Sequence, residues 1–67
     1  MITVFVNGDA QAIPDGQHLA ELVDAHTRSR SGVAVAVDGE VVPRTAWPRH
    51  ALHAGAQIEI ITAVQGG

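Results

Sequence analysis

The last three residues of the chain, Gln65, Gly66 and Gly67, offer the clearest opportunity for chemistry in the sequence. Two consecutive glycines have no Cβ atoms, so they form a thin tip with a freely rotating backbone. Such a tip can enter a channel that any side chain would block. The alternative interpretation is a frayed terminus, because order commonly fails at chain ends. Since the tail follows a strand-like segment with no linker, we expect residues 65–67 to be a flexible functional tail.

The chemistry of such a tail is that of its terminal carboxylate. A carboxylate does not react with a sulfur nucleophile at neutral pH, because oxide is a poor leaving group. Conversion to an acyl-adenylate supplies a good leaving group, and a partner enzyme has to carry out that step. The reactive group predicted here is therefore the carboxylate of Gly67, presented to another protein.

The remaining side chains form no convincing catalytic or metal site. His50 and His53 have a spacing that could hold a metal on a helix, but a third ligand is missing. Ser29 and Ser31 lie in a polar loop without the strand-to-helix elbow of an activated serine. The chain has no cysteine and no glycine-rich phosphate-binding motif. We therefore expect a protein that is not an enzyme and that binds neither a metal nor a stable cofactor.

Composition excludes further classes of function. Four basic and seven acidic side chains give a net charge of -3, and no basic cluster appears, which argues against nucleic-acid binding. The apolar runs are too short to span a bilayer, and no signal-peptide pattern opens the sequence. Together with the lack of cysteine, which fits the cytoplasm weakly, this predicts a cytoplasmic domain without a membrane partner.

Periodicity predicts five strands and one helix. Alternation indicates a strand over residues 2–7, and Asn7-Gly8 is a strong hairpin signal before a short strand at 10–13. Apolar residues at helical spacing indicate an amphipathic helix over 18–28, with Glu21 where a capping-box acid would lie. Further strands are expected at 33–37, 40–42 and 57–64, whereas 44–56 is expected to be irregular. The strand at 33–37 is apolar on both faces and therefore belongs inside a sheet.

This order of elements predicts an α+β fold of one domain, residues 1–67. Two hairpins flank one helix, and the final strand must lie between them. A mixed sheet of four or five strands with the helix packed across one face satisfies this order. That layout is the β-grasp, or ubiquitin-like, fold.

Four segments of the sequence form a recognisable set: Phe5-Val6-Asn7-Gly8, Leu19-Ala20-Glu21-Leu22, the stretch from Val33 to Arg44 with Trp47, and the closing Val64-Gln65-Gly66-Gly67. Together they resemble the ThiS family, the sulfur carriers of thiamin biosynthesis. The resemblance covers nearly the whole chain. The Gly-Gly end alone is shared with molybdopterin-synthase small subunits and ubiquitin, whereas Val-Val-Pro-Arg followed by Trp47 favours ThiS.

The resemblance implies a cycle run by partner proteins. A ThiF-type adenylyltransferase would adenylate Gly67 with ATP, a sulfur donor system would convert it to a thiocarboxylate, and a ThiG-type thiazole synthase would take the sulfur. Gly66 and Gln65 would thread into the active site of the partner. The chain departs from the family's common pattern at Ala54-Gly55-Ala56, where an acidic turn is frequent, and at His18, where Ser or Thr is frequent.

Three alternatives remain open. A carrier of the same fold could feed molybdopterin or cysteine synthesis, or the chain could be a ubiquitin-like protein modifier joined through Gly67. The absence of lysine counts against lysine-linked chains of this protein but not against single attachment. A plain interaction domain would leave the Gly-Gly end unexplained.

A partner-docking patch is predicted on the sheet face that points away from the helix. Alternation turns Val4, Val6, Ile58 and Ile60 toward the helix, so that Phe5 and Ile61 face outward, with Ala34 and Ala36 beside them. A contiguous apolar group near a reactive tail suggests an interface. The alternative is that the segment 44–56 around Trp47 folds over these residues and buries them.

Overall fold

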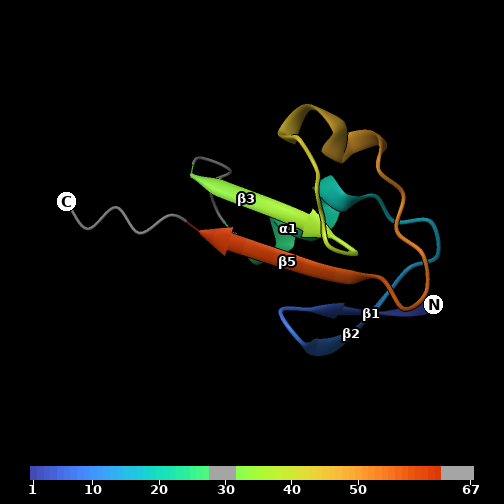
Figure 1. The fold of residues 1–67 in the computed structure, drawn as a ribbon. Helices are drawn as coiled ribbons and strands as arrows, with labels where there is room; N and C mark the ends of the chain where they lie inside the picture. The colour runs from blue at the N-terminus through green and yellow to red at the C-terminus, as the bar shows by residue number, and fades with distance from the viewer. Residues whose placement is uncertain (28–31, 63–67) are drawn as a thin grey trace.

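The computed structural model describes residues 1–27 and 32–62 and shows a five-stranded sheet with two helical segments (Figure 1). The functional tail predicted at residues 65–67 and the loop serines Ser29 and Ser31 lie outside the described residues. Along the chain the elements are β1 (Ile2–Val6), β2 (Asp9–Ile13), α1 (Leu19–His26), β3 (Val33–Val37), β4 (Glu40–Val41), the 3₁₀ helix η1 (Arg44–Arg49) and β5 (Gln57–Thr62).

The strand order in the sheet is β2-β1-β5-β3-β4, which confirms that the last strand lies between the two hairpins. β5 runs parallel to β1 and antiparallel to β3. The parallel pairing is short, since it joins only Phe5 to Gln57 and Val6 to Ile58, whereas the antiparallel pairing continues to Val33 and Thr62. β5 therefore extends beyond the end of β1, as Figure 1 shows.

The core lies between one face of the sheet and the helical segments. Alternate strand residues point into it, so Val4, Val35 and Ile58 are almost completely buried, as are Leu19, Leu22 and Val23 of α1. Ile60 packs against this cluster from its edge. The alternation read from the sequence thus assigned the inward face of β1 and β5 correctly.

Both hairpins are built on tight turns that require left-handed backbone at two successive residues. Asn7 and Gly8 have φ values of 51° and 88°, and Asp38 and Gly39 have values of 53° and 84°. This combination of positive φ values is typical of the type I′ turn, whose twist matches that of the adjoining strands. Asn7 and Asp38 are thus the first left-handed residues of their turns and lie on opposite sides of β5, Asn7 beside Ile60 and Asp38 beside Gln57.

The helix α1 is shorter than the predicted span 18–28, because it ends at His26. Glu21 accepts a hydrogen bond of 3.0 Å from the backbone N–H of His18, as the capping-box pattern predicts. At the other end, the N–H of Thr27 donates to the carbonyl of Val23. No helix within residues 1–27 and 32–62 is long and apolar enough to cross a membrane.

The prediction that residues 44–56 are irregular is wrong for the first half of this segment. Residues Arg44–Arg49 form η1, in which Trp47 is only 1% exposed and donates from Nε1 to the carbonyl of Val42 over 2.9 Å. Pro43 precedes the helix and Pro48 lies inside it, which removes two backbone donors and keeps the element short.

The ends of three strands differ by one residue from their predicted positions, since β1 ends at Val6 rather than Asn7 and β2 begins at Asp9 rather than Ala10. β4 ends at Val41 rather than Val42, although the N–H of Val42 still donates to the carbonyl of Val35. β5 is described as far as Thr62, and its predicted extension through Ala63 and Val64 lies outside the described residues.

Candidate functional site

The candidate site is the end of β5 together with the sheet face that points away from α1. Gln65, Gly66 and Gly67, which carry the predicted chemistry, lie outside the described residues, so the described part of the site is the platform from which the tail continues. Thr62, the last described residue, is paired with Val33 of β3. The chain beyond Thr62 thus continues from a strand in the middle of the sheet.

The outward face carries the four residues predicted to form the docking patch, but it separates them into two places. Ile61 is 58% exposed and pairs directly with Ala34, which is also exposed. Ala36 is half-buried and pairs with Glu59. Phe5 is half-buried and pairs with Gln57, four residues before Ile61 on β5.

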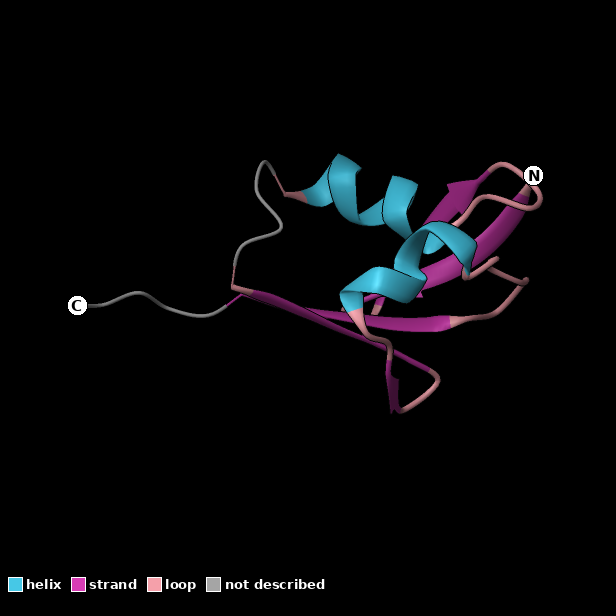
Figure 2. Ribbon diagram, turned by 90° about the horizontal axis from the view of Figure 1, so that it is seen from above, coloured by secondary structure: helices cyan, strands magenta, loops and turns pink. Residues whose placement is uncertain are grey.

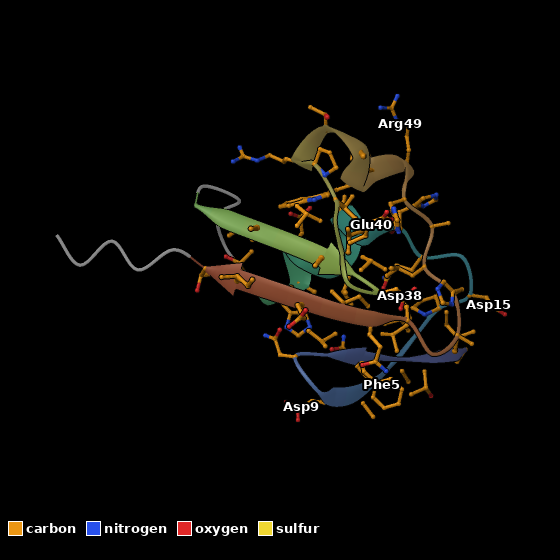
Figure 3. All side chains as sticks on the ribbon, in the orientation of Figure 1. Phe5, Asp9, Asp15, Asp38, Glu40 and Arg49 are labelled. Atoms are coloured by element: carbon orange, nitrogen blue, oxygen red, sulfur yellow. The ribbon has the colours of Figure 1, made fainter. Side chains whose placement is uncertain are left out.

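Phe5 is therefore not an immediate neighbour of Ile61. At about 3.3 Å per residue, four residues of strand separate their rows by roughly 13 Å. The exposed carboxylate of Glu59 lies on the same face between them. Phe5 instead neighbours Ala10 of β2, and Figure 3 shows it well away from the end of β5.

One residue of the outward face was missed by sequence reasoning. Val41 is 73% exposed and pairs with Ala36 across β3 and β4, so the two side chains lie on the same face. Its position in a two-residue edge strand gives no alternation from which this orientation could be read. We refer below to Ala34, Ala36, Val41 and Ile61 as the outer patch.

The alternative in which the segment around Trp47 covers this face is contradicted by the structure. Trp47 belongs to the core cluster together with residues of α1, and the N–H of Leu19 donates to the carbonyl of His50 over 2.8 Å. Figure 2 shows both helical segments on the same side of β3 and β5. The outer patch is thus left exposed by η1.

A polar cluster lies at the opposite end of β5 from the tail. Asp38 accepts one hydrogen bond of 3.0 Å from the N–H of Gln57 and another of 2.9 Å from Nε2 of His53. These two bonds hold the pKa of the Asp38 carboxyl below its ordinary value, and the bond from Gln57 has the larger effect. The hydrogen bond to Asp38 raises the pKa of His53, and the contact between Nδ1 and the carbonyl of Ala54 adds to this effect.

His50 and His53, the candidate metal pair, do not form the core of a larger ligand set. Within the described ranges, no group of three or more histidine, aspartate or glutamate side chains could hold a metal ion. His18 and His26 also lie on the surface, where His26 contacts the side chain of Gln11. The described residues enclose no pocket.

Known proteins share both the sequence features and the fold of this chain. The model of the ThiS family matches residues 4–67, which includes the terminal Gly66 and Gly67. The chain is 30% identical over 64 residues to the sulfur carrier protein ThiS of Escherichia coli K12, covering 96% of this chain and 97% of that protein.

Two solved structures from Geobacter metallireducens have the same fold. The crystal structure of its thiamine biosynthesis protein ThiS superposes with a TM-score of 0.81 at 25% identity, covering 98% of this chain and all of the other. The solution structure of a thiamine biosynthesis protein from that organism gives a TM-score of 0.80, covering 98% of this chain and 88% of the other. From the sheet order, the family match through Gly67 and these relatives, the chain belongs to the ThiS family.

Proposed function

We propose that this chain carries sulfur as a thiocarboxylate on Gly67 and delivers it for the thiazole ring of thiamin. The observation that carries the proposal is the family match that extends through Gly67, supported by a relative at 30% identity that is named a sulfur carrier. In this role the chain is a protein co-substrate, and catalysis belongs to its partners.

The proposed chemistry has two steps at the terminal carboxylate. In the first step a carboxylate oxygen of Gly67 attacks the α-phosphorus of ATP, and pyrophosphate leaves. In the second step a sulfur nucleophile from a donor system attacks the acyl carbon, and AMP leaves with the bonding electron pair. With a persulfide as the nucleophile, this attack forms an acyl disulfide. A second thiol of the donor system then attacks the donor's sulfur of that S–S bond, so the donor is left as a disulfide and the glycyl carbon keeps the sulfur as a thiocarboxylate.

The partners we propose follow from these steps. A ThiF-type adenylyltransferase binds ATP and Gly67, a sulfur donor system supplies the nucleophile, and a ThiG-type thiazole synthase receives the sulfur. Because the cycle consumes ATP, we place it in the cytoplasm. Gly66 and Gln65 thread into the adenylating active site, where the missing side chain of Gly66 leaves room for the narrow approach.

The adenylating enzyme is also the partner we propose for the outward face of the sheet. Ile61 and Ala34 lie next to the end of β5, so a protein that contacts them also holds the start of the tail. Phe5 contributes at the far margin of the same face, beyond Glu59. This contact is apolar at its centre, which is the character of stable protein interfaces.

The test compares the full chain with a variant that lacks Gly67 and a variant with one alanine added after Gly67. Each is incubated with the cognate ThiF-type enzyme and ATP, and pyrophosphate release is measured. We expect activity only with the full chain, while circular dichroism shows all three folded. Intact mass after addition of the sulfur donor should increase by the exchange of one oxygen for sulfur. Undiminished adenylation of the truncated chain would overturn the proposal.

A further inference from the structure

Asn7 makes a long-range contact that its place in a hairpin turn does not require. Its side-chain Oδ1 accepts a hydrogen bond of 2.9 Å from the N–H of Ile60, and its Nδ2 lies 3.4 Å from the carbonyl oxygen of the same residue. The backbone N–H of Asn7 also donates to the carbonyl of Ile58 over 2.8 Å. One residue of the β1–β2 turn thus binds three backbone groups of β5.

These bonds replace the pairing that β1 does not provide. β1 pairs with β5 only as far as Ile58, whereas β5 continues to Thr62 (Figure 1). Within a strand, the N–H and carbonyl of alternate residues face the same neighbour, so those of Ile60 face the side on which β1 has already turned away. An amide side chain carries one acceptor and one donor group, as a peptide unit does. The side-chain amide of Asn7 therefore takes the place of one more backbone peptide unit in the pairing between β1 and β5.

Turn chemistry alone does not explain the choice of asparagine. Asp38 occupies the equivalent position of the other turn with nearly the same φ, and its carboxylate accepts a hydrogen bond from the N–H of Gln57. There the carbonyl of Gln57 is already bound by the backbone N–H of Asp38, so an acceptor is sufficient. At Ile60 both a donor and an acceptor are needed, and only the asparagine of the two turns supplies both.

We propose that Asn7 is a positioning residue for activation of the C-terminal glycine, a role that rests on the function proposed above. By binding Ile60, Asn7 fixes the last described part of β5, from which the chain continues toward Gly67. Without the bond, the end of β5 is held by β3 alone. The terminal glycine then samples more orientations, and a smaller fraction of them is productive for adenylation.

The test uses variants that preserve the turn. Asn7→Gly keeps the left-handed backbone and removes both side-chain bonds, whereas Asn7→Asp keeps the acceptor for the Ile60 N–H. Asp38→Gly is the matched control, because it also removes two side-chain bonds from a turn: the bond to the Gln57 N–H, at the end of β5 far from the tail, and the bond to His53. For each variant we would measure amide exchange at Ile60, affinity for the ThiF-type enzyme, and the adenylation rate at saturating carrier.

We expect Asn7→Gly to increase exchange at Ile60 and to lower the saturated adenylation rate at least about fivefold, the effect of losing the 2.9 Å bond alone, while Kd is unchanged. Asn7→Asp should recover part of the rate, and Asp38→Gly should adenylate normally. A faster Ile60 exchange with an unchanged rate would overturn the positioning role alone. An equal slowing of adenylation by Asp38→Gly would overturn that role as well. Failure of the wild-type chain to be adenylated would instead overturn the proposed function.

Discussion

His53 and Asp38 are joined by a hydrogen bond of 2.9 Å that ties the segment before β5 to the β3–β4 turn. Nδ1 of the same imidazole lies 2.9 Å from the carbonyl oxygen of Ala54. Both ring nitrogens thus face acceptors, and only the doubly protonated ring can donate to both. The pair is exposed, with 64% of the His53 side chain and 47% of the Asp38 side chain accessible, so solvent screens the interaction.

This geometry predicts the pH range in which the pair stabilises the fold. The pKa of His53 is raised above its ordinary 6.5, so its contribution is complete below that pH and is lost as the pH rises through the folded-state value. The pKa of Asp38 is lowered below its ordinary 3.8, so its contribution is complete above that pH and is lost as the pH falls through the folded-state value. Both contributions are therefore present between pH 3.8 and pH 6.5.

We therefore expect His53→Gln to lower the Tm most near about pH 5 and progressively less toward alkaline pH. An NMR titration should give His53 a pKa above 6.5, and Asp38→Asn should bring it back toward that value. An identical His53 titration in the two proteins would show that the hydrogen bond is not formed in solution.

A second prediction concerns the buried indole of η1. Trp47→Phe removes the bond from Nε1 to the Val42 carbonyl and leaves that buried acceptor without its indole donor. The free energy of unfolding should fall by about 1 to 3 kcal/mol, measured by urea denaturation. The control is Val41→Ala, which truncates an exposed neighbour and should change stability by less than about 0.5 kcal/mol. Equal stability of Trp47→Phe and the wild type would contradict a net contribution from the indole bond.

The two hairpins and the inward residues were predicted from local signals, whereas the place of β5 between the hairpins was predicted from the order of elements in a β-grasp layout. Alternation fixes the faces of β1 and β5, and the pairs Asn7-Gly8 and Asp38-Gly39 fix two hairpins. η1 was missed because a 3₁₀ segment interrupted by Pro48 has no helical period to detect.

The arrangement of the candidate site depended on register, which alternation leaves open. The register pairs Phe5 with Gln57 and Ile61 with Ala34, and these pairings decide which outward residues are neighbours. No local sequence pattern predicts the register. The contact of Asn7 with Ile60 spans 53 positions in the sequence and was invisible for the same reason. The signal that could have suggested this contact is an asparagine in an Asn-Gly turn next to a strand that is longer than its neighbour.

A third prediction concerns the width of the tail. Gly66→Val adds a β-branched side chain that thickens the tip and restricts its backbone. Adenylation by the ThiF-type enzyme should fall by at least an order of magnitude, as pyrophosphate release will show, if the tail enters the adenylating site through the narrow approach proposed above. Thermal unfolding should be unchanged, since Gly66 lies beyond the described sheet. A normal rate of adenylation with Gly66→Val would show that the channel is wide.

The last prediction tests the outer patch as the docking surface for the adenylating enzyme. Ile61→Ala removes the exposed apolar side chain nearest the end of β5 and should weaken binding by about 1 kcal/mol or more, with little change in Tm. Phe5→Ala should also weaken binding, with a greater loss of stability because Phe5 is half-buried.

A pair of matched charge insertions separates docking from folding. Ala34→Glu places a carboxylate beside Ile61, whereas Ala25→Glu places the same group on the exposed side of α1, away from the sheet. Both alanines are exposed, so both variants should fold, but only Ala34→Glu introduces a charge that the interface must desolvate. Isothermal calorimetry should therefore show a markedly higher Kd for Ala34→Glu and an unchanged Kd for Ala25→Glu. If Ile61→Ala and Ala34→Glu both bind as tightly as the wild type, the enzyme docks elsewhere. A large fall in the Tm of Phe5→Ala with unchanged affinity would place Phe5 in the core rather than in the interface.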